Sequence, residues 1–79
     1  MSNIREIARQ WAQIILPDPA TVDPKQDAYK AAHAIEDAAR KDATKRGAPT
    51  EPDGWYRDVG AWRTQLRIAI MKRIEASRG

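Results

Sequence analysis

Residues 23–47 read DPKQDAYKAAHAIEDAARKDATKRG, and this stretch determines the expected fold. Asp23 can cap a helix, Pro24 suits its first turn, and a basic last turn ends at the terminator Gly47. Apolar residues in between recur at the three- and four-residue spacing of one helical face: Ala28, Ala31, Ala32, Ile35, Ala38 and Ala39. The pattern predicts a helix over residues 24–46 with an inner face of small side chains, which lets its neighbours lie close.

Two proline-rich breaks, residues 17–24 and 47–54, separate this segment from two further helical segments. Proline disfavours helix at its own position and at the residue before it, so both breaks are boundaries. The flanking apolar stripes are Ile4, Ile7, Ala8, Trp11, Ile14 and Ile15, and then Trp55, Val59, Trp62, Leu66, Ala69 and Ile70. The predicted helices span about residues 3–16, 24–46 and 53–77, and the three tryptophans fill the space beside the alanine face. Short connections favour an all-α, small three-helix antiparallel bundle.

Length and composition limit what the chain can be. Its 79 residues suffice for a single helical domain, residues 1–79, with an expected stability margin of roughly 3 to 5 kcal/mol. The hydrophobic content of 42% suits a folded chain better than a disordered one. Cysteine is absent, and no stretch approaches the roughly 18 apolar residues of a membrane span. We expect a cytoplasmic protein that is neither secreted nor embedded in a membrane.

The residue types that catalysis needs are scarce. A nucleophile requires a neighbouring base oriented by a third group, and the single histidine, His33, has ordinary charged surface companions. One histidine without cysteine cannot form a closed zinc site, and the glycines are too scattered for a phosphate-binding loop. We interpret Glu36 and Asp37 as surface charges that pair with the bases four positions later. We therefore predict no enzyme activity, no cofactor and no metal site.

The third predicted helix carries more apolar and aromatic residues than one core stripe can hold. Beside the stripe runs a second strip in which basic and apolar groups alternate, a composition typical of protein interfaces. We predict that a partner contacts five residues of this strip: Tyr56, Arg63, Arg67, Met71 and Ile74. The alternative is that Tyr56, Met71 and Ile74 complete contacts with the other two helices, while the arginine stems cover the edge.

The leading functional hypothesis is a small non-catalytic protein that binds a larger protein or complex and acts by steric inhibition or adaptation. In size and in its lack of motifs, the chain is similar to the small inhibitors with which phages and other mobile elements block host machinery. This resemblance is one of genre, and it implies a partner protein without identifying it.

Two other functions stay open. A nucleic-acid-binding accessory protein could use the basic C-terminal helix, because residues 63–79 hold five bases and one acid. Against it stand a net charge of only +3 and a long proline-rich connection, which fits a helix-turn-helix poorly. A small homo-oligomeric structural subunit could instead bury Ile68 and the strip around Met71 between copies of itself.

Overall fold

The computed structural model describes residues 4–45 and 59–79, apart from the side chains of Thr44 and Val59. Their backbone forms three α-helices, α1 (Ile4–Ile15), α2 (Ala28–Lys45) and α3 (Val59–Arg78), with a short 3-10 helix, η1 (Pro19–Thr21), after α1. The all-α prediction is confirmed, and these two ranges contain no strand. The predicted helical residues 53–58, with Trp55 and Tyr56, lie outside the described residues, as do residues 3 and 46.

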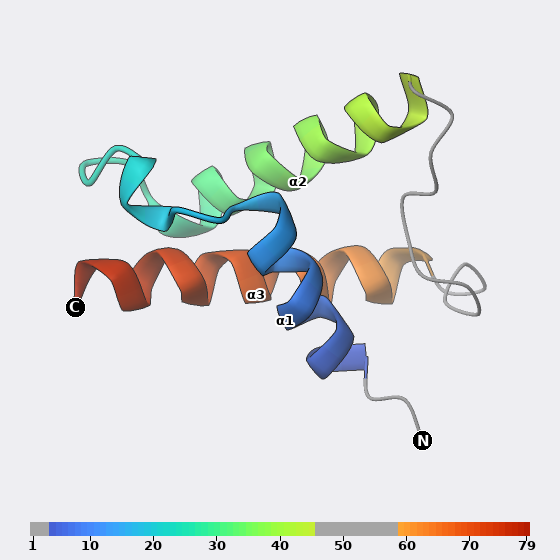
Figure 1. The fold of residues 1–79 in the computed structure, drawn as a ribbon, viewed down its shortest axis with the longest axis horizontal. Coiled ribbons are helices and arrows are strands. Elements are labelled where there is room, and N and C mark those ends of the chain that lie inside the picture. The colour runs from blue at the N-terminus through green and yellow to red at the C-terminus, as the bar shows by residue number, and fades with distance from the viewer. Residues whose placement is uncertain (1–3, 46–58) are drawn as a thin grey trace.

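α3 is the helix on which the other two assemble (Figure 1). Both α1 and α2 pack mainly against α3 and touch each other little. α2 and α3 lie side by side and run in opposite directions, whereas α1 crosses the middle of α3 obliquely (Figure 1). The predicted bundle is therefore present, with α2 and α3 as its antiparallel pair. A helix with two partners needs apolar residues over a wider arc than a helix with one, which explains the second strip on α3.

Large side chains from α3 fill the space between small side chains from α1 and α2. Trp62, Ile70 and Ile74 are the largest fully buried side chains, and all three belong to α3. The buried alanines in the same cluster come from the other two helices: Ala8, Ala12, Ala31 and Ala32. The alanine face of the middle helix is thus confirmed at its centre, although Ala38 at its edge is exposed. Interdigitation of large and small side chains lets the helices approach closely without leaving voids.

α1 turns most of its predicted apolar stripe toward α3. Trp11 meets Trp62 edge to face, with ring centroids 5.9 Å apart, a favourable arrangement for an aromatic pair. Further residues of the stripe pack against the core while partly buried: Ile4, Ile7 and Ile15. The placement of Ile14 on the core face is wrong, because 74% of this residue is exposed. The contact centres on Ala8 and Ala12, and Leu16, farther along the chain, also reaches the core. Ile14 is exposed because it lies on another side of the helix from these residues.

α2 begins four residues later than predicted, at Ala28 rather than at residue 24. The backbone N–H of Lys30 donates to the Asp27 carboxylate at 2.9 Å, so Asp27 caps the helix in place of Asp23. Residues 23–26 form a turn instead, in which the Asp23 carbonyl accepts from the Gln26 N–H at 3.0 Å and the Asp23 carboxylate accepts from the Lys25 N–H at 2.9 Å. Arg78 donates to the backbone carbonyls of Asp23 and Gln26 in this turn. A helix that began at residue 24 would use the Asp23 carbonyl for its own first hydrogen bond.

Arg73 secures the end of α1 from the opposite helix. Its Nε donates to the Leu16 carbonyl at 2.7 Å and its Nη2 donates to the Pro17 carbonyl at 2.9 Å. The last turn of α1 contains no basic residue, so its exposed carbonyls lack the cation that often stabilises a helix C-terminus. Arg73 supplies that charge from α3 and fixes the crossing of the two helices.

We expect Arg73→Ala to lower the free energy of unfolding by about 1.5 to 3 kcal/mol, because charge-assisted hydrogen bonds to two carbonyls are lost. The neighbouring base Lys72 is exposed and provides a matched control. Lys72→Ala should change the stability by less than about 0.5 kcal/mol. Urea unfolding followed by tryptophan fluorescence measures both variants, and equal effects would contradict the role of Arg73.

Candidate functional site

Four of the five residues predicted to contact a partner are described, and all four make contacts within the chain; Tyr56 lies outside the described residues. Ile74 is completely buried in the core, and Met71 packs against the core from its edge. Arg63 and Arg67 reach across to the carboxylate of Glu36 on α2. The prediction of Ile74 as a partner contact is corrected, because a fully buried side chain has no surface to offer. The alternative considered for this strip, that its apolar residues pack within the protein, is confirmed for Met71 and Ile74.

Glu36 is the centre of an ion cluster between α2 and α3. Only 2% of its side chain is exposed, and its Oε1 accepts a hydrogen bond from Arg67 Nε at 2.8 Å. Arg63 Nε lies 3.5 Å from the same oxygen, and Arg40 Nε lies 3.5 Å from Oε2. The interpretation of Glu36 as surface charge is therefore wrong, although its pairing with Arg40 is confirmed. One buried carboxylate thus lies against three guanidinium groups where the alanine face of α2 meets α3.

Asp37 sits beside this cluster on the outer side of α2. Its carboxylate lies 3.1 Å from Lys41 Nζ and also pairs with Arg40. The hydrogen bond from Lys41 lowers the pKa of Asp37 below its ordinary value of 3.8, and Coulombic attraction to Lys41 and Arg40 acts in the same direction. The predicted pairing of Asp37 with Lys41, four residues on, is confirmed.

Because the folded-state pKa is depressed, the contribution of Asp37 to stability is complete above pH 3.8 and is lost as the pH falls through the folded pKa. An NMR titration of the Asp37 side-chain carboxyl carbon should therefore have its midpoint below pH 3.8. Lys41→Met should raise this midpoint, since it removes the donor. A native midpoint at or above the ordinary value would contradict the assigned pair.

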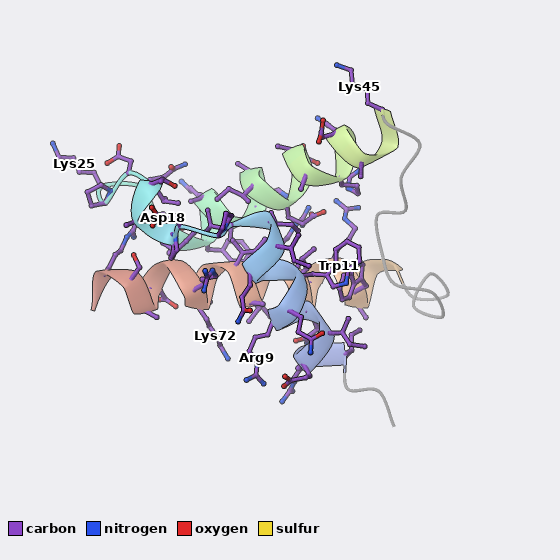
Figure 2. All side chains as sticks on the ribbon, viewed as in Figure 1. Arg9, Trp11, Asp18, Lys25, Lys45 and Lys72 are labelled. Carbon is purple, nitrogen blue, oxygen red and sulfur yellow. The ribbon has the colours of Figure 1, made fainter. Side chains whose placement is uncertain are left out.

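A groove of about 910 Å³ lies between α1 and α3, on the side away from the Glu36 cluster. Its apolar lining consists of small or branched residues: Ala12, Pro19, Ile68, Ala69 and Ala76. Its polar lining consists of Gln13, Gln65 and Ser77, and its basic lining consists of Arg5, Arg9, Lys72 and Arg73. Figure 2 shows Arg9 from α1 and Lys72 from α3 extending to the same side of the molecule. Basic side chains from both α1 and α3 thus line the same groove.

The groove concentrates positive charge. Its lining contains four bases and, among the described residues, no acid, while the whole chain carries a net charge of only +3. The Arg73 head donates to backbone carbonyls, and Arg9 lies 3.4 Å from Glu6 in an exposed pair. Such exposed pairs contribute at most about 1 kcal/mol, so a carboxylate from a partner can replace Glu6. Arg9 and Lys72 are therefore the bases best placed to meet an approaching anion.

The basic residues of α3 are mostly bound within the chain. Arg63 and Arg67 contact Glu36, whereas Arg73 and Arg78 donate to carbonyls of the segment between α1 and α2. Four of the five bases from residue 63 onward therefore contact groups of the protein itself. The excess of positive charge that the sequence places on this helix holds the fold together.

His33 is exposed on α2. Across residues 4–45 and 59–79, no three His, Cys, Asp or Glu side chains gather closely enough to hold a metal ion. Within the same ranges, no helix has the length and apolar character that crossing a bilayer requires. Comparison of the chain with protein-family models, with curated proteins and with solved structures found no match.

Proposed function

We propose that this is a non-catalytic binding protein that attaches to a larger partner protein through the groove between α1 and α3. The observation that carries the proposal is the composition of the groove. Apolar surface at Ile68 and Ala69 adjoins the exposed cations Arg9 and Lys72, and no acid occurs among the described lining residues. Protein interfaces combine an apolar centre with a polar rim in this way, and arginine is enriched in them.

A nucleic-acid partner is less well supported by the same residues. Nucleic-acid binding draws its affinity from many phosphate contacts, which require a row of available cations. Four of the five bases near the C-terminus are engaged within the chain. The exposed bases of the groove lining are Arg5, Arg9 and Lys72, which are few for such a row and suit individual carboxylates on a protein surface.

The proposed action is steric. The helices supply a scaffold in which α3 is held on both sides, by Glu36 of α2 and through the bonds of Arg73 to the end of α1. A preorganised surface loses little conformational entropy on binding, so modest contacts suffice for useful affinity. Seated on its partner, the protein would block a functional surface or bring that surface to another component.

The test is affinity capture of the tagged protein from nuclease-treated lysate of its source organism, with mass spectrometry of what is retained. We expect one stoichiometric protein partner, and we expect Arg9→Glu with Lys72→Glu to reduce its retention about tenfold through like-charge repulsion. Lys25→Glu with Lys30→Glu makes the same change of charge at exposed positions outside the groove and should retain the partner.

Two outcomes would contradict the proposal. A partner that is retained from untreated lysate but lost from nuclease-treated lysate would assign the protein to nucleic acid. Equal retention by the two double variants would place the binding surface elsewhere. Circular dichroism establishes that each variant keeps its helices. Light scattering of the purified protein at two concentrations detects self-assembly, and an oligomer blocked by the groove substitutions would favour a homo-oligomeric subunit.

A further inference from the structure

We infer that the groove between α1 and α3 recognises an acidic segment of the partner protein that carries an apolar anchor side chain. The inference rests on the proposed function and adds the chemistry of the bound segment. It follows from three features of the groove: the sign of its charge, the size of its apolar side chains and the absence of aromatic rings from its described lining.

The charge selects carboxylates. Arg9 and Lys72 reach the same side of the molecule from two different helices, so one segment lying along the groove can meet both (Figure 2). Arg9 already holds a carboxylate, that of Glu6, at 3.4 Å. A partner carboxylate can take the place of Glu6, because an exposed pair within one helix gains little from its own geometry.

The apolar part of the groove provides room for an anchor. Ala69 and Ala76 are small, and they leave the groove its volume of about 910 Å³ beside Ile68. A partly exposed isoleucine alone needs no explanation. Within a basic groove, however, Ile68 favours a ligand that has both apolar surface and negative charge. Burial of the apolar surface against Ile68 adds to the affinity that the charge pairing provides.

The lining also disfavours single-stranded nucleic acid, which shares the negative charge. Proteins that bind single strands stack the bases on aromatic side chains within a basic groove. The described residues that line this groove include no aromatic side chain. Trp11 and Trp62 pack against each other and are not part of the lining. An acidic protein segment is therefore the ligand class that fits both the charged and the apolar parts.

The probe is a short, acetylated and amidated peptide of repeating glutamate and leucine, titrated into the ¹⁵N-labelled full chain. We expect amide shifts centred on Gln13, Ile68 and Lys72, in the groove lining. A peptide with glutamine for glutamate and a peptide of glutamate alone should each bind about tenfold more weakly, since each lacks one of the two contacts. An oligothymidine should bind more weakly than the glutamate–leucine peptide.

Two variants assign the contacts. Arg9→Glu with Lys72→Glu should weaken the glutamate–leucine peptide about tenfold. Ile68→Ser should make the glutamate–leucine peptide bind no more tightly than the peptide of glutamate alone. The control Lys25→Glu should leave the affinities of both peptides unchanged. The dispersion of the amide spectrum verifies that every variant is folded.

Equal binding of the glutamine and glutamate peptides, shifts that lie outside the groove, or tighter binding of oligothymidine would each overturn the inference. Lack of any peptide binding would also overturn it, and the proposed function would stand if groove-dependent capture of a partner protein persisted. Failure of the capture itself would remove the proposed function.

Discussion

Glu36→Ala is expected to lower the free energy of unfolding by about 3 kcal/mol, the lower end of the cost of breaking a buried ion pair. The carboxylate is almost fully buried and lies against three guanidinium groups, so its loss leaves like charges facing one another at the contact of α2 and α3. The lower end applies because these arginines keep 18 to 32% of their side chains exposed. For a domain with a margin of roughly 3 to 5 kcal/mol, this loss leaves about 0 to 2 kcal/mol, so between a few per cent and about half of the molecules would be unfolded.

Urea unfolding monitored by circular dichroism measures this effect. Glu6→Gln, which removes a carboxylate whose side chain is 55% exposed, is the control and should change stability by less than about 0.5 kcal/mol. In a double-mutant cycle with Arg67→Ala, the two changes in the free energy of unfolding should be strongly non-additive. Once Glu36 is absent, Arg67→Ala removes a charge that has lost its partner, so it should cost less than in the native protein. Equal effects of the Glu36 and Glu6 substitutions, or additivity in the cycle, would contradict the structural role of the cluster.

Trp62→Ala is expected to lower the free energy of unfolding by about 3 to 5 kcal/mol, the usual cost of deleting a large buried aromatic side chain. Only 1% of Trp62 is exposed, and its ring meets Trp11 edge to face. The buried residues that α1 and α2 contribute to the core are largely alanines, which cannot move to fill the space. The cavity would therefore persist unless the helices shifted.

Ile14→Ala provides the control for this substitution. Ile14 belongs to the apolar stripe of the first helix by spacing, yet it is largely exposed, so its truncation should change stability by less than about 0.5 kcal/mol. Trp62→Phe should fall between the two, since it keeps an aromatic ring in the core. Thermal unfolding followed by circular dichroism ranks the three variants, and a cost for Ile14→Ala that matched Trp62→Ala would contradict the packing described.

The helices of this protein follow from local sequence, because capping residues and prolines act within a few positions of themselves. The faces of the helices do not follow in the same way. Spacing places Ile14 in the apolar stripe of the first helix, but the packing of α1 on α3 buries the side that carries Ala8 and Ala12 and leaves Ile14 exposed. The turn before α2 also receives a contact that local sequence does not reveal, because Arg78, distant in sequence, donates to the carbonyls of Asp23 and Gln26.

Glu36 shows why burial of a charge is difficult to predict. By local pattern, an acid followed four residues later by an arginine reads as surface charge, and that pair does exist. Arg63 and Arg67 are one turn apart on the third helix, so one acceptor can meet both, but their spacing does not say which residue it is. Only the docking of α2 on α3 shows that Glu36 is that acceptor.

The groove could not be predicted as a site, because its charged residues come from opposite ends of the chain. Arg9 and Lys72 become neighbours only through the crossing of α1 and α3. The sequence did single out Ile68 as an apolar residue apart from the core stripe, and the structure places it in the groove lining. The composition of the strip on the third helix is typical of an interface, but contacts within the chain account for its described members Arg63, Arg67, Met71 and Ile74.

The most direct test of binding through the groove is site-specific photo-crosslinking. A benzophenone amino acid would replace Ile68 in the groove or, as the control, the exposed His33 on α2, and each protein would be irradiated in lysate of the source organism. We predict one nuclease-resistant, protease-sensitive adduct from position 68 and none of that mass from position 33. The same adduct from position 33 alone, or an adduct that nuclease destroys, would contradict the account.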